Sequence, residues 1–220
     1  MASHLDLEEQ EQLAQLRHFW NTYGNWITWA LIAVLGAYAA WNGYQYWQRD
    51  QAAKASVLYD EVERAAAAGD AARIERSLAD MKDRFGSTTY AHQAALLAAR
   101  ALVEQDKADA ARAALRWVQD KAAEPVYRDV ARLRLAGLEL DAQAHDQALA
   151  LLQGDFDPAL GALAADLRGD VLMAKGQGAE AVTAYRQAWE RMDSKVEYRR
   201  LVQAKLLALG VDPEQAESAR

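Results

Sequence analysis

The sequence contains no cysteine and little proline. The lack of cysteine excludes disulfide bonds, thiol catalysis, iron–sulfur clusters and cysteine-ligated zinc, although it does not select a cellular compartment. Three prolines in 220 residues, together with abundant alanine, favour an all-α chain, because proline breaks helices and alanine is the best helix former. Basic residues are outnumbered by acidic ones, and the formal net charge of −7 argues against nucleic acid as a partner.

Charge is absent from residues 19–48, and five of the seven tryptophans lie in this run. A helix of that length spans roughly 45 Å, about the thickness of a bilayer with its headgroups. Tryptophan and tyrosine gather toward both ends of the run, as in the aromatic belts at membrane interfaces. We therefore expect a transmembrane signal-anchor helix over residues 19–48, in contact with the lipid bilayer, after an acidic tail over residues 1–18.

Two other interpretations of this run stay open. It is also compatible with a buried helix of a soluble protein, or with a signal peptide cleaved after the small-x-small pattern at 37–39. The acidic 1–18 tail disfavours a cleaved leader, which is ordinarily basic. The orientation is undecided by charge, because Arg17 precedes the run while Arg49 and Lys54 follow it.

Residues 49–210 are charged, rich in alanine and periodic at helical spacing. Four short polar turns interrupt them, at 67–70, 105–107, 143–146 and 175–178. The positions that follow the turns are spaced 37, 37 and 33 residues apart, close to the tetratricopeptide period of about 34: Ile74, Ala111, Ala148 and Ala181. The last repeat also matches the tetratricopeptide pattern of small and bulky residues: Gly169, Gly176, Ala181, Tyr185 and Ala188.

These features predict an all-α fold, in which a single transmembrane helix precedes a tetratricopeptide-like helical-repeat solenoid. A C-terminal helix over Lys195–Leu209 is expected to cap the solenoid, because the last repeat would otherwise expose its apolar face. Residues 211–220 are expected to form a flexible tail.

Taken together, the two halves of the chain resemble the YfgM family, the ancillary subunits of the bacterial SecYEG translocon. The residues that carry the resemblance are the aromatic segment 41–47 (WNGYQYW) and the block 162–176 (ALAADLRGDVLMAKG), and the similarity extends from about Leu16 to Leu209. The resemblance implies a single-pass protein of the bacterial inner membrane, with its N-terminus in the cytoplasm and its repeat domain in the periplasm. It further implies partnership with the SecYEG translocon, with a PpiD-like periplasmic chaperone and with unfolded secretory proteins. The implied task is to help transfer newly translocated proteins to periplasmic chaperones.

No motif in the sequence indicates catalysis, a cofactor or a metal. The four histidines lack metal-ligand spacing, and neither a phosphate-binding glycine loop nor a nucleophile elbow is present. We therefore expect a binding protein rather than an enzyme. Two alternatives remain: a structural scaffold for envelope protein complexes, and a stress-signalling regulator that acts through the cytoplasmic 1–18 tail.

Two candidate binding surfaces follow from helical geometry. First helices of stacked pairs line the concave face of a solenoid, and their candidate contact residues are Leu96, Arg100, Val103, Leu133, Leu140, Asp166, Asp170 and Met173. For Asp166 and Asp170, a local charge network is the alternative interpretation. Small residues at four-residue spacing predict a helix-packing face on the uncharged run, composed of Ala33, Gly36, Ala37 and Ala40.

Overall fold

The structure is a computed structural model, and it describes residues 7–218. Every regular element in this range is an α-helix, from α1 (Leu7–Ala67) to α10 (Pro213–Ser218). The chain divides into two compact units, residues 1–51 and 52–220. The predicted all-α class is thus confirmed for the part of the chain that is described.

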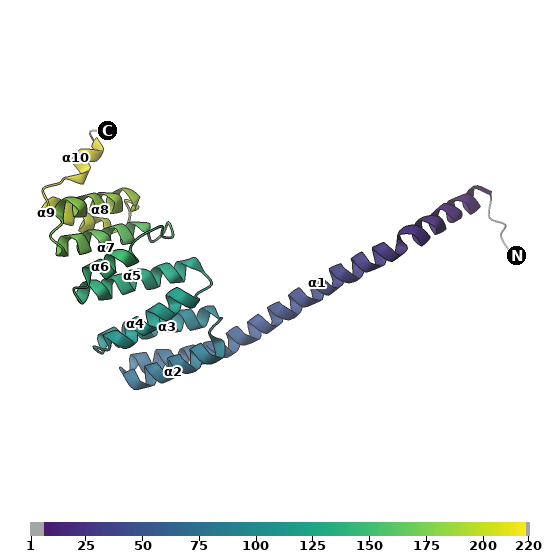
Figure 1. Ribbon diagram of the computed structural model, residues 1–220, viewed down its shortest axis with the longest axis horizontal. Helices are drawn as coiled ribbons and strands as arrows, with labels where there is room; N and C mark the ends of the chain where they lie inside the picture. Colours follow the sequence, from purple (N-terminus) through teal and green to yellow (C-terminus); the bar gives the residue numbers. More distant parts are fainter. Residues whose placement is uncertain (1–6, 219–220) are drawn as a thin grey trace. The chain divides into compact units, whose positions relative to one another are not determined.

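The first unit consists, where it is described, of the N-terminal part of α1, which Figure 1 shows as one continuous helix. The predicted transmembrane helix is wrong: within residues 7–218, no helix combines the length and the apolar character that a membrane span requires. With 61 residues α1 is long enough, so apolarity is the condition that fails. Side-chain amides such as those of Asn21, Asn25 and Asn42 interrupt the run and lower its mean hydropathy. The absence of charge over residues 19–48 was therefore a poor measure of apolarity.

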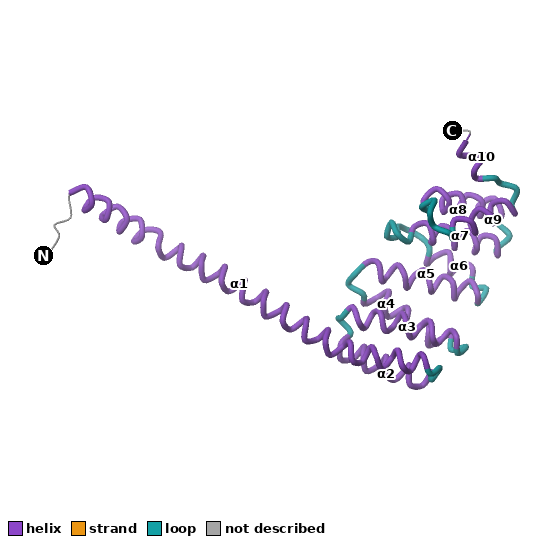
Figure 2. The backbone as a smooth tube through the Cα atoms, turned by 180° about the vertical axis from the view of Figure 1, so that it is seen from behind, coloured by secondary structure: helices purple, strands orange, loops and turns teal. Residues whose placement is uncertain are grey.

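The second unit is a stack of helix pairs joined by short turns (Figure 2). The end of α1 pairs with α2 (Ala71–Phe85) through a shared core and the Glu61–Arg73 hydrogen bonds. Helix α3 (Thr89–Glu104) pairs with α4 (Ala108–Lys121). The next pairs are α5 (Pro125–Asp141) with α6 (His145–Leu151), and α7 (Gly161–Ala174) with α8 (Gly178–Arg191). Helix α9 (Arg199–Ala208) packs against α8 as the expected cap. It begins at Arg199 rather than at Lys195, because the preceding residues form hydrogen-bonded turns.

One backbone geometry recurs at the turn inside each pair. The turn residue has positive φ in all four cases: Gly69, Asp106, Gln143 and Gly176. The next residue then donates its N–H to a carbonyl five positions back, at 2.8–3.1 Å, which is the helix-ending Schellman arrangement. The four equivalent positions expected from the periodicity are all fully buried: Ile74, Ala111, Ala148 and Ala181. The predicted repeat register is thereby confirmed.

The core of the second unit is built from small residues at helix crossings and larger ones between the pairs. The largest cluster runs from the end of α1 to α5 and includes Leu102, Leu115 and Val118. Smaller clusters surround Leu152 between α5 and α7, and Tyr185 between α7, α8 and α9. This packing fixes the first helices of successive pairs beside one another and so creates the surface on which a partner can bind.

Candidate functional site

A groove of about 390 Å³ opens between α3 and α5, the first helices of two successive pairs. Its floor includes Leu115 of α4, which is 1% exposed, and its rim includes Val103, which is 40% exposed. Gly137 leaves the α5 wall open, since no heavy atom lies within 4 Å of the position that a Cβ would take there. The groove is lined by Ala99, Arg100, Val103, Glu104, Leu115, Arg134, Gly137, Leu138 and Asp141. It combines an apolar base with charged groups on both walls.

Two arginines provide the positive charge of the groove. The Arg134 Nη1 donates to the backbone carbonyl of Leu96 at 2.7 Å. The Arg100 Nε donates to the Glu104 carboxylate at 3.0 Å, one turn along α3. Partial burial, and then the neighbouring charge of Arg100, lower the pKa of Arg134. Arg134 is exposed to solvent at the groove, and among the described residues it is paired with no carboxylate.

The structure brings Arg100 and Val103 together in the groove and distributes the other candidate residues differently. Leu96 is 8% exposed and belongs to the core, with its carbonyl bound by Arg134. Leu133 and Leu140 are half-buried against the cluster around Leu152. Met173 is exposed on α7 but does not line the groove. The concave face as a partner-binding surface stays a prediction.

Asp166 and Asp170 belong to a partly buried ion cluster between α7 and α9, in which Asp166 is the most deeply buried group. The Lys205 Nζ donates to both carboxylate oxygens of Asp166 at 2.9 Å and lies 2.7 Å from an Asp170 oxygen. The hydroxyls of Tyr198 and Tyr185 donate to Asp166 and Asp170 at 2.7 and 2.8 Å. The contacts of these two aspartates are therefore those of a local charge network. The cap helix α9 covers this part of the predicted concave face.

The same cluster keeps both tyrosines protonated. Burial is the largest cause that raises the pKa of Tyr185, and the hydrogen bond to Asp170 adds to it. Burial and the hydrogen bond to Asp166 raise the pKa of Tyr198 in the same way. Both hydroxyls thus remain donors to carboxylates, and the cluster secures α9 on the last repeat.

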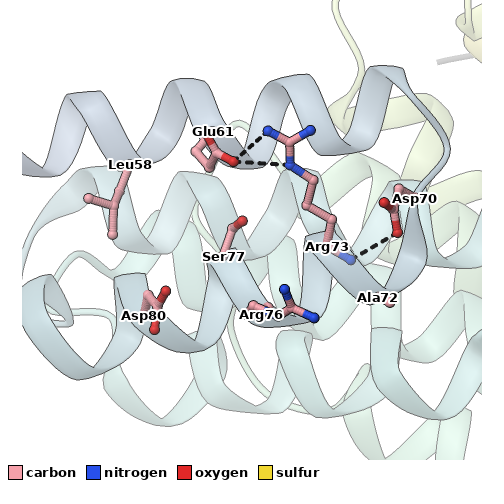
Figure 3. Close-up of a pocket in the computed structure, with 8 residues that line it drawn as sticks. All are labelled: Leu58, Glu61, Asp70, Ala72, Arg73, Arg76, Ser77 and Asp80. Atoms are coloured by element: carbon pink, nitrogen blue, oxygen red, sulfur yellow. Dashed lines mark hydrogen bonds and ion pairs between the residues drawn. The ribbon is translucent and has the colours of Figure 1, made fainter.

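A polar recess of about 400 Å³ lies between the end of α1 and α2 (Figure 3). Across it, the Glu61 carboxylate accepts two hydrogen bonds from Arg73, at 3.0 and 2.6 Å, and Asp70 caps α2 by accepting from the Arg73 N–H. The Arg73 hydrogen bonds hold the pKa of Glu61 below its usual value. This ion pair satisfies the charges at the centre of the recess internally. Within residues 7–218, no three acidic or histidine side chains are grouped so as to hold a metal.

The predicted helix-packing face lies in the first unit. Its residues Ala33, Gly36, Ala37 and Ala40 are exposed on α1, and a Cβ on Gly36 would meet nothing within 4 Å. A helix partner for this face stays a prediction.

Most residues that line the groove were not in the predicted contact set, among them Arg134, Gly137 and Leu138 of α5. These α5 residues lie three and four positions apart, and so share one stripe of α5 with Asp141. That spacing was visible in the sequence, but alanine-rich helices carry several such stripes. Only the packing of α3 against α5 shows which stripe faces a groove.

Comparison with known proteins covers both units of the chain. Residues 17–211 match the family described as tetratricopeptide repeat-like domain. The ancillary SecYEG translocon subunit of Neisseria gonorrhoeae is 31% identical over 210 residues, which are 95% of this chain and all of that protein. The chain belongs to the ancillary SecYEG translocon subunit family. Relatives of the same name in Haemophilus influenzae and Escherichia coli are each 28% identical, over 83% of this chain and 89% and 85% of their own lengths.

Membership of the ancillary translocon subunit family confirms the resemblance to YfgM proteins that the sequence indicated. The α3–α5 groove and the α7–α9 cluster both lie within the matched repeat region. No solved structure matches the chain.

Proposed function

We propose that this protein is an ancillary subunit of a SecYEG translocon and that its repeat domain binds newly translocated polypeptide segments. The observation that carries the proposal is the groove between α3 and α5, in a chain whose relatives bear the name of that subunit. Bound segments would then pass to periplasmic chaperones, with a PpiD-like chaperone as the partner. We propose that the protein acts at the periplasmic side of the inner-membrane translocon, where translocated segments emerge.

The groove has the properties that transient binding of a polypeptide requires. Its apolar residues Val103 and Leu138 offer contact to side chains of an incoming segment, and charged residues lie on both of its walls. The stacked pairs form a scaffold for the groove, so a segment does not have to order it. Association with the translocon would raise the local concentration of segments, so that weak contacts suffice.

The proposal is tested by photocrosslinking from the groove of the full-length protein in its own bacterium. A photoreactive residue replaces Val103, and in the matched control it replaces Ala113, an exposed residue of α4 outside the groove. We expect adducts between the Val103 position and a secretory protein arrested during translocation, few adducts from Ala113, and recovery of SecYEG with both.

Two results would count against the proposal. Failure to recover SecYEG under crosslinking refutes the assignment to the translocon. Equal adducts from the Val103 and Ala113 positions refute binding in the groove and favour the scaffold alternative, in which the subunit joins membrane proteins without contacting secretory polypeptides.

A further inference from the structure

Arg134 is a solvent-exposed cation that lines the groove. Arg134 forms no ion pair with any residue in the described range 7–218, and its one hydrogen bond there is to the Leu96 carbonyl, a neutral acceptor. A guanidinium has five N–H donors, so most of them remain available to a ligand.

The neighbouring charges do not compensate Arg134. Arg100 repels it and helps to lower its pKa. Glu104 is engaged by Arg100, and Asp141 lines the groove without an ion pair to either arginine among the described side chains. With Glu104 engaged by Arg100, the guanidinium of Arg134 is the group in the groove that is free to bind an anion, and it can do so by charge-assisted hydrogen bonds.

The rest of the groove restricts what kind of anion fits. Val103 and Leu138 are apolar, Leu115 closes the floor, and Gly137 leaves space along the wall. A small inorganic ion would leave these apolar surfaces in water. A carboxylate side chain next to apolar side chains would contact both parts of the groove at once.

We propose that the groove binds a polypeptide segment in which a glutamate or aspartate side chain is flanked by apolar residues. The carboxylate accepts hydrogen bonds from Arg134, and the adjacent apolar side chains pack on Val103 and Leu138. This rests on the proposed function in one respect, that the ligand is a polypeptide. It adds a sequence preference, which the family name does not contain.

The test measures the binding of two fluorescent peptides to the full-length protein by anisotropy. Both peptides are extended and blocked at each end; one has a central glutamate between leucine and valine, and the other has glutamine at that position. The variant Arg134→Gln removes the charge, and Arg128→Gln on the same helix is the matched control, since Arg128 is exposed and does not line the groove. Equal thermal midpoints of the variants establish that each is folded.

We expect the wild type and Arg128→Gln to bind the glutamate peptide about tenfold more tightly, the difference typical of one charge-assisted hydrogen bond. In Arg134→Gln this preference should disappear while binding of the glutamine peptide is unchanged. The preference should also shrink as salt is added, because the ion pair lies at an accessible groove.

Equal binding of the two peptides by the wild type would overturn the inference, and so would a preference that survives in Arg134→Gln or the absence of binding to either peptide. Recovery of SecYEG is measured on the same proteins. If the peptide preference fails while SecYEG is recovered, only the inference fails. If the preference holds while SecYEG is not recovered, the translocon assignment fails and the groove remains an acidic-peptide site.

Discussion

Gly169 lies in α7 at the crossing with α8, where the structure leaves no room for a methyl group. A Cβ at this position would lie 2.4, 2.5 and 2.8 Å from three ring atoms of Tyr185. The ring cannot easily move away, because Tyr185 is 3% exposed and its hydroxyl donates to Asp170 at 2.8 Å. The substitution Gly169→Ala therefore forces either the helices or the ring to shift.

The expected magnitude follows from opposing effects. Alanine in place of a helical glycine stabilises the helix by about 1 kcal/mol. Overpacking a buried site costs about 1–3 kcal/mol, and displacement of Tyr185 from the Asp170 carboxylate costs about 1.5–3 kcal/mol more. Combining these ranges, we expect Gly169→Ala to lower the free energy of unfolding by about 1.5–5 kcal/mol.

Urea unfolding followed by far-ultraviolet circular dichroism measures this effect. Gly137→Ala is the matched control, since Gly137 lies inside helix α5 and a Cβ there meets nothing within 4 Å. This control should be stabilised by about 0.5–1 kcal/mol, because only the helix preference and the entropy of the unfolded chain change. If both alanine variants shift the unfolding midpoint in the same direction, the close packing of Gly169 on Tyr185 does not limit stability, and the reasoning is refuted.

Three further predictions concern charge, pH and backbone conformation. The variant Lys205→Met leaves the buried Asp166 carboxylate without its cation and should destabilise the fold by about 3–5 kcal/mol. Amide hydrogens of α9 should exchange faster in this variant than in the control Lys195→Met, which changes an exposed lysine. Equal exchange of α9 in the two variants would contradict the role of the cluster in holding α9. Burial outweighs the nearby Glu124 and lowers the pKa of His92, so neutral His92 contributes its full share of stability above about pH 6.5, and this stability is lost as the pH falls below that value. The variant His92→Phe should therefore make the urea midpoint less dependent on pH. An unchanged dependence of the urea midpoint on pH would contradict this prediction. Gln143 has φ of 59°, so Gln143→Gly should raise the thermal midpoint through relief of about 1 kcal/mol of strain, whereas a fall in that midpoint would show that the turn is unstrained.

Local patterns were sufficient to predict the repeat architecture. The turns at 67–70, 105–107, 143–146 and 175–178 are encoded in a few adjacent residues, and each contains the positive-φ residue that ends its first helix. The buried positions after the turns follow from helical periodicity, which is also local. The start of the cap helix was less predictable: residues 193–198 adopt hydrogen-bonded turns, and the helix begins at Arg199 rather than at the expected Lys195.

The prediction of a transmembrane helix was wrong because the absence of charge was used in place of mean hydropathy. Residues 19–48 lack charge, but their amides and tyrosines make the segment less apolar than a membrane span requires, and no described helix qualifies. Charge is counted residue by residue, whereas suitability for a membrane depends on the mean hydropathy over about 20 residues.

By itself, the sequence determined the all-α class, the repeat period, the positions of the turns and the family, because each of these depends on short-range order or on similarity along the chain. Only the tertiary structure decided which helix stripes are open to a partner. Arg134 lines a groove because α3 packs beside α5, and Asp166 is closed off because Lys205, 39 residues further along the chain, lies against it. Such contacts depend on how several helices pack together, and no segment of the sequence specifies them alone.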